Sequence, residues 1–109
     1  MASDVAGFKE AHARYLAAKT KGEARVHDLP TYFWRPSEVD AEIHACMSEH
    51  GMKNCMRRDY LGIGKHGIEL WAVIVSRGGA DSADGGGDVL AAFDFSYLCP
   101  PWCNEDAPA

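Results

Sequence analysis

The segment Ile68–Ser76 limits the folds open to this chain more than any other feature. It is almost continuously apolar from Leu70 through Val75. A short apolar run of this kind is typical of a strand covered on both faces, because an exposed face would carry alternating polar residues. The run therefore predicts an interior strand in the middle of a sheet.

Two other segments are predicted to be strands. Residues 53–61 form a mixed strand, and a glycine-rich turn at Gly62–Gly67 follows it. The segment Val89–Leu98 alternates, and Pro100 and Pro101 end it because proline cannot donate a ladder hydrogen bond. One face of this last strand, which we expect to pack on the helices, carries Val89, Ala91, Phe93, Phe95 and Tyr97.

Two amphipathic helices precede these strands. Ser3 or Asp4 caps the first helix and Gly22 ends it, with an apolar stripe that comprises Val5, Phe8, His12, Tyr15 and Leu16. The second helix runs from about Glu38 to His50 and ends at Gly51. Its apolar stripe comprises Val39, Ile43, Cys46, Met47 and His50.

Helices followed by a run of strands predict an α+β fold. We expect a three- to four-stranded antiparallel sheet with two helices packed on one face, and a short additional strand at residues 23–29. The 109 residues fit one domain, with an irregular C-terminal tail at residues 98–109. The segment Arg77–Asp88 contains five glycines and three aspartates, and is predicted to be the most flexible interior loop.

Charge and the N-terminal sequence narrow the classes of partner. The formal net charge is −5, whereas binding to nucleic-acid phosphates needs a basic face, so we expect no nucleic-acid partner. No apolar run is long enough to cross a bilayer, and the first residues lack the basic and apolar regions of a signal peptide. We therefore expect a cytoplasmic protein without a membrane partner, whose four cysteines are reduced.

The cysteines offer a zinc-stabilised module as one alternative. The spacing matches no common zinc signature, and Cys46 on the apolar stripe is also typical of a core residue. We expect no bound metal and no cofactor, with Cys46 buried. In the alternative, zinc is held by ligands drawn from Cys46, His50, Cys55, Cys99 and Cys103.

Three further motifs have structural explanations. The segment Cys99–Cys103 has no following helix to lower a thiol pKa, so catalytic redox chemistry is not expected. The segment Gly62–Gly67 matches the G-x-G-x-x-G pattern of dinucleotide-binding sites. A strand is predicted after it, however, where the cofactor would need a helix. The segment Asp81–Asp88 lacks the ligand pattern of a calcium loop.

No spacing of residues indicates a catalytic centre. Nothing places a general base beside a nucleophile, so no catalytic residue is predicted. Asp94 follows Phe93 and shares a strand face with Leu90 and Leu98, which leaves two alternatives. Its carboxyl group is either partly buried with a perturbed pKa or directed to solvent from the outer face of the sheet.

The aromatic segment before the second helix is the most suggestive binding feature. Tyr32, Trp34 and Arg35 are residue types that dominate protein interfaces, and Trp102 adds another tryptophan near the C-terminus. The alternative is that Trp34 packs in the core. We predict a small, acidic, non-enzymatic binding or regulatory protein that contacts a protein partner through these four residues, for example as an inhibitor or accessory protein of a larger complex. A small enzyme of unknown reaction is a further alternative.

Overall fold

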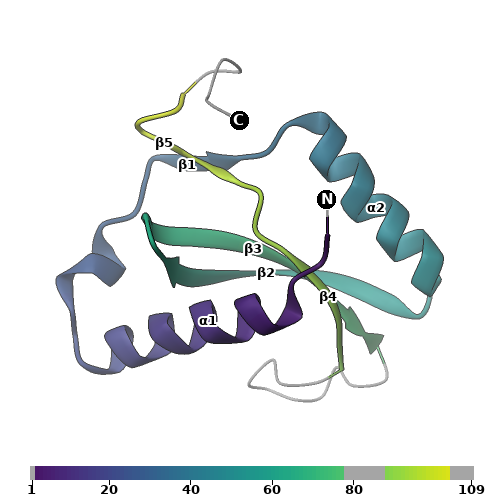
Figure 1. The fold of residues 1–109 in the computed structure, drawn as a ribbon, viewed down its shortest axis with the longest axis horizontal. Coiled ribbons are helices and arrows are strands. Elements are labelled where there is room, and N and C mark those ends of the chain that lie inside the picture. Colours follow the sequence, from purple (N-terminus) through teal and green to yellow (C-terminus); the bar gives the residue numbers. More distant parts are fainter. Residues whose placement is uncertain (1, 78–87, 104–109) are drawn as a thin grey trace.

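The computed structural model describes residues 2–77 and 88–103 of the chain (Figure 1). Most of the predicted flexible loop Arg77–Asp88 and the end of the predicted tail therefore lie outside the described residues. In chain order, the elements are α1 (Val5–Thr20), the 3-10 helix η1 (Ala24–His27), β1 (Tyr32–Trp34), α2 (Ser37–His50), β2 (Cys55–Gly64), β3 (Gly67–Ser76), β4 (Val89–Phe93) and β5 (Tyr97–Cys99).

Strand β3 lies in the middle of a three-stranded antiparallel sheet, in the order β2-β3-β4. It pairs with β2 along its whole length, from Cys55 opposite Ser76 to Gly64 opposite Gly67. Strand β4 pairs only with the second half of β3, beginning at Ala72 opposite Phe93. The predicted interior strand and the α+β class with antiparallel strands are confirmed.

The two helices cover opposite faces of this sheet. Because side chains alternate along a strand, Trp71, Val73 and Val75 point to one face and pack against Phe8 and Ala11 of α1. On the other face, the α2 residue Ile43 packs in a cluster with Cys55, Ala72, Ile74, Ala91 and Phe93. The predicted arrangement with both helices on one face is corrected here: a strand buried on both faces needs a cover on each.

Helix α1 approaches the β2–β3 hairpin closely at Gly62. A Cβ atom at this position would lie 2.8 Å from Cβ of Ala11 and 3.1 Å from the ring of Trp71, so any larger residue would push the helix away. Gly62, one glycine of the predicted turn, thus has a packing role. Strand β2 continues through Gly64, and the hairpin turns only at Lys65 and His66 before Gly67, whose φ is +104°.

The segment predicted as a strand at residues 23–29 is instead the 3-10 helix η1. Of Ala24 and Val26, whose spacing suggested a strand, only Val26 is buried. Val26 enters a third cluster at the tip of the hairpin with Ala18, Ile63 and Ile68. The alternation therefore reflected one buried residue and not a strand.

The predicted strand Val89–Leu98 is divided between two sheets. Strand β4 ends at Phe93, and after Asp94–Ser96 the chain forms β5, which pairs with β1 in a separate antiparallel ribbon. Phe95 is 47% exposed in the crossing segment, so its predicted packing on the helices is wrong. The predicted irregular tail also begins in β5, at Leu98 and Cys99.

Figure 1 shows the β1–β5 ribbon beyond the hairpin, on the side away from α1 and next to the start of α2. Phe33 of β1 packs against the cluster at the hairpin tip. Within the described ranges, no helix is both long and apolar enough to cross a membrane.

Candidate binding site

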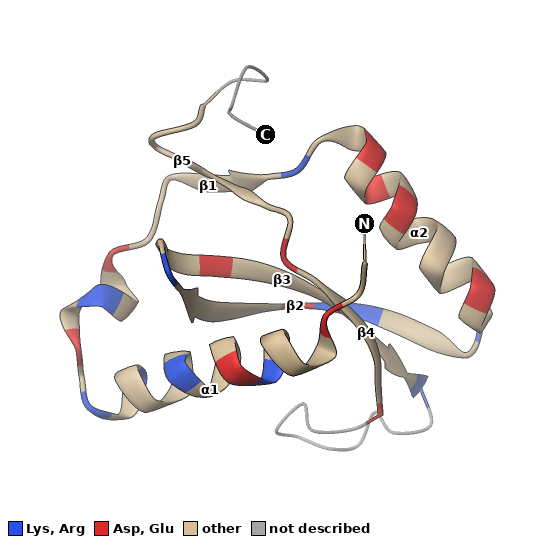
Figure 2. Ribbon diagram, viewed as in Figure 1, with Lys and Arg blue, Asp and Glu red and all other residues tan. Residues whose placement is uncertain are grey.

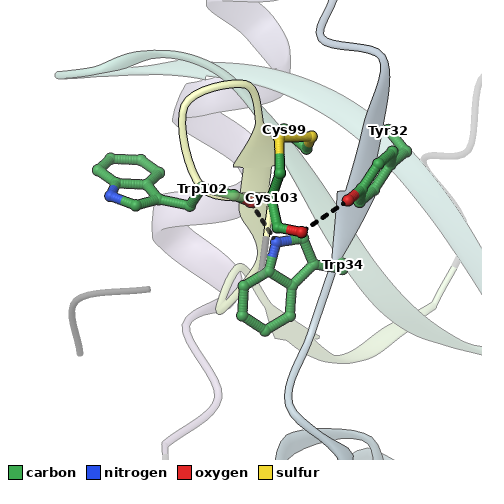
Figure 3. Close-up of a disulfide and its surroundings, with 5 residues drawn as sticks. All are labelled: Tyr32, Trp34, Cys99, Trp102 and Cys103. Atoms are coloured by element: carbon green, nitrogen blue, oxygen red, sulfur yellow. Dashed lines mark hydrogen bonds between the residues drawn. A yellow bond between two sulfur atoms is a disulfide. The ribbon is translucent and has the colours of Figure 1, made fainter. Parts of the chain in front are cut away.

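The β1–β5 ribbon brings together aromatic residues from two distant parts of the chain. The ring of Trp34 stacks on that of Tyr97 at a centroid distance of 4.8 Å, and the rings of Tyr97 and Trp102 meet edge to face at 6.2 Å. Nε1 of Trp34 donates a hydrogen bond of 2.6 Å to the carbonyl oxygen of Trp102. Three of the four predicted partner-binding residues, Tyr32, Trp34 and Trp102, thus lie in one cluster (Figure 3).

A disulfide between Cys99 and Cys103 closes the end of the ribbon into a small loop. The hydroxyl of Tyr32 donates a hydrogen bond of 3.0 Å to the carbonyl oxygen of Cys103, so Tyr32 and Trp34 of β1 both bind this loop (Figure 3). The expectation that all four cysteines are reduced is wrong for this pair. The consequence is that the loop carrying Trp102 is held in place by a covalent bond and two side-chain hydrogen bonds.

Two adjacent grooves lie beside this loop. The first, here called the proline groove, has a volume of about 480 Å³ and its lining includes Arg25, Leu29, Pro30, Pro100, Pro101 and Trp102. The second, here called the acidic groove, has a volume of about 340 Å³ and its lining includes Glu69, Asp94, Phe95, Tyr97, Leu98 and Trp102. Trp102 and Leu98 line both grooves, and so do His66 and Ile68 of the hairpin.

The acidic groove exists because β4 leaves β3 halfway along its length. Beyond Ala72, no strand among the described residues pairs with this edge of β3. The carbonyl oxygen of Leu70 accepts hydrogen bonds from Nη2 of Arg35, at 2.8 Å, and from the hydroxyl of Ser96, at 3.2 Å. Two side chains thus replace the missing strand at this one point, and the groove opens beside it.

Arg35, the fourth predicted partner-binding residue, is directed into the protein. Its Nε is buried without a hydrogen-bond partner, and burial lowers the pKa of its guanidinium below the ordinary value, with a further contribution from the charge of Arg57. A guanidinium normally satisfies its donors when it is buried. The bond to Leu70 indicates that Arg35 fixes the ribbon and α2 relative to β3.

Two half-buried carboxyl groups line the acidic groove. Burial raises the pKa of Glu69, and Asp94 raises it further, while a 3.2 Å hydrogen bond from Nε1 of Trp71 opposes the shift. Burial also raises the pKa of Asp94, and the charge of Asp4 adds to this. Of the two alternatives for Asp94, the structure supports partial burial. Sequence reasoning missed Glu69 because it occurs within the apolar strand and comes near Asp94 only in the folded chain.

The candidate zinc ligands do not converge. Cys99 and Cys103 bond to each other, and Sγ of the fully buried Cys55 donates to the carbonyl oxygen of Met47 at 3.6 Å. Cys46 is only half-buried at the edge of its cluster, so Cys55 occupies the core position predicted for Cys46. His50 is exposed at the end of α2. Across residues 2–77 and 88–103, no three His, Cys, Asp or Glu side chains form a group that could hold a metal ion.

Comparison of the chain with protein families, with curated proteins and with solved structures finds no match. The two grooves combine aromatic rings, exposed apolar side chains and two carboxyl groups around a concave surface.

Proposed function

We propose that this protein is a small, acidic, non-enzymatic binding or regulatory protein that acts by contacting a protein partner. An inhibitor or accessory protein of a larger complex fits this description. The observation that carries the proposal is the concentration of exposed apolar side chains around the two grooves. Leu29 in the proline groove is 50% exposed, Phe95 in the acidic groove is 47% exposed, and half-buried Trp102 lines both grooves. Tyr32, which is 44% exposed, lies beside them, bonded to the loop that carries Trp102.

Such a surface is suited to binding because it is held rigid before the partner arrives. The disulfide and the hydrogen bonds from Tyr32 and Trp34 restrict the loop that carries Trp102. Binding then loses little conformational freedom, and more of the contact energy appears as affinity. In this proposal Trp102, Phe95 and Tyr32 touch the partner, while Trp34 and Arg35 hold the surface in position.

The cytoplasmic location predicted from the N-terminal sequence belongs to the same proposal. The disulfide Cys99–Cys103 bears on it, because such bonds persist mainly in oxidising compartments. Alkylation of free thiols immediately after cell lysis, followed by mass spectrometry of the peptide containing both cysteines, measures their state. A fully oxidised pair in a native host would contradict the cytoplasmic location.

The proposal is tested by pairing Phe95→Ala with Leu16→Ala. Both side chains are 47% exposed, but Leu16 lies on α1 and lines neither groove. A partner captured from host lysate, identified and purified, is titrated against the wild type and both variants. We expect Phe95→Ala to weaken binding about tenfold or more and Leu16→Ala to leave it unchanged. Equal effects of the two variants would contradict the proposed surface.

A further inference from the structure

The acidic groove has the dimensions of a site for one long side chain. Its volume of about 340 Å³ is near the lower end of the range of about 300–1,000 Å³ that is usual for ligand pockets. The rings of Tyr97 and Trp102 stand at 75° to each other and form a corner, and Phe95 adds a third aromatic side chain to the lining. An aromatic corner of this kind binds either an apolar group or a cation over a ring face.

The charges of the residues that line the groove distinguish between an apolar group and a cation. Glu69 and Asp94 supply two carboxyl groups, and the described lining of this groove includes no Lys or Arg. Arg14 and Arg35 act on these carboxyl groups from outside the lining, and His66 lies within it. Glu69 accepts a hydrogen bond from the indole of Trp71, and the carboxyl group of Asp94 accepts one from its own backbone, so both donors are neutral. The groove therefore favours a positively charged group over an apolar one.

The surroundings of the groove have the same sign. Helix α2 begins at the groove, where Pro36 and Val39 belong to the lining. This helix carries four acidic residues and no Lys or Arg, as its red bands in Figure 2 show. An acidic helix beside an acidic groove attracts a basic segment of a partner and orients it during the encounter.

Desolvation of the two carboxyl groups in the acidic groove costs free energy when they are ionised. Both groups are half-buried, and this desolvation raises the pKa of each. Titratable groups whose pKa values are shifted and which lie in a concave site are typical of functional sites.

We propose that the acidic groove binds a single Lys or Arg side chain of the protein partner, with the cation near Glu69 and Asp94 and the aliphatic stem against Tyr97 and Trp102. This inference rests on the proposed function and deepens it, because it names the chemistry of the residue by which the partner is anchored. The carboxyl groups supply charge-assisted hydrogen bonds, and the rings supply cation–π contacts.

The test is a selection of random twelve-residue peptides, displayed on phage, against the purified full chain. Enriched peptides are synthesised together with neutral analogues in which each Lys is replaced by norleucine and each Arg by citrulline. We expect one basic position to recur, and its neutral analogue to bind about tenfold or more weakly. Asp94→Asn and Glu69→Gln should weaken the basic peptide while changing the neutral analogue little, and Glu10→Gln, on the exposed side of α1, should change neither.

The outcomes separate the two proposals. Peptides that require Phe95 and Trp102 but bind equally well with a neutral analogue would overturn the inference and leave the proposed function standing. Basic peptides whose affinity survives Asp94→Asn and Glu69→Gln would also overturn it, because their cation binds elsewhere. A selection that enriches no peptide contradicts both proposals.

Discussion

The two sides of the β2–β3 hairpin are held together by different forces. On the α1 side, apolar side chains pack closely, with Trp71 only 3% exposed and Gly62 allowing the helix to approach the hairpin. On the ribbon side, a disulfide, side-chain hydrogen bonds to backbone carbonyls and stacked rings hold the elements, and two grooves remain open. The α1 side is closed by buried apolar packing, whereas the ribbon side leaves several side chains partly exposed around the two grooves.

The three tryptophans provide the strongest test of this difference. Trp71→Ala removes a buried ring from the α1 side, and we expect the free energy of unfolding to fall by about 3–5 kcal/mol. Trp102→Ala removes a half-buried ring from the ribbon side and should cost less than about 1 kcal/mol. Urea unfolding followed by circular dichroism measures both. Similar losses for the two variants would mean that the ribbon belongs to the same core.

The loss of stability in Trp34→Ala is expected to lie between the losses in Trp71→Ala and Trp102→Ala. Trp34→Ala removes both its stacking on Tyr97 and its hydrogen bond to Trp102, with an expected loss of about 2 kcal/mol. Trp34→Phe keeps a stacked ring but not the hydrogen bond, and should cost about 1 kcal/mol. Melting temperature and partner affinity are measured together. A large fall in melting temperature with unchanged affinity of the folded fraction would make Trp34 purely structural.

Reduction of the disulfide should have a smaller effect. For a loop as short as Cys99–Cys103, chain entropy gives a stabilisation of about 2 kcal/mol at most. We expect dithiothreitol to lower the stability of the wild type by no more than this amount, and to weaken partner binding because the loop carrying Trp102 gains freedom. The variant Cys103→Ser provides the control, since dithiothreitol should not change it. An equal response in this variant would assign the effect to another cause.

The smallest expected effect is a gain of stability. Burial raises the pKa of Asp94 above its ordinary value of 3.8, so the folded state binds this proton more tightly than the unfolded chain. Its contribution to stability is therefore greatest below the unfolded pKa and falls as pH rises through the window up to the folded pKa. Asp94→Asn should be more stable than the wild type at neutral pH, by less than about 1 kcal/mol because the group is only half-buried.

This gain should disappear on acidification. As pH falls below the ordinary pKa of 3.8, the wild-type carboxyl is protonated in both the folded and the unfolded state. The difference in free energy of unfolding between the wild type and Asp94→Asn should then be close to zero. Unfolding in urea at a series of pH values follows the difference. A variant that is less stable than the wild type at neutral pH would show that the charged form of Asp94 is favoured by the fold, contrary to the direction of its pKa.

Local patterns in the sequence were sufficient for part of the site. Tyr32, Trp34 and Trp102 were grouped by residue type, and the structure places them in one cluster, although no observation yet tests their role in binding. Glu69 and Phe95 were not singled out, because a carboxyl group within an apolar strand and an aromatic residue in an alternating segment carry no local sign of a groove. The local sequence pattern also did not predict which face of the sheet each helix covers.

The sequence by itself determined the two helices, the central position of β3 and the antiparallel α+β class, since burial periodicity and capping residues such as Asp4 act within a few neighbours along the chain. Only the tertiary structure decided where the segment Val89–Leu98 passes from one sheet to the other. The same alternating pattern runs through β4 and β5, but β4 pairs with β3 and β5 pairs with β1. The tertiary structure also decided the faces of the helices, the disulfide and the acidic groove. All of these features depend on contacts between residues far apart in the sequence. The free energy of such contacts cannot be predicted from a local sequence pattern.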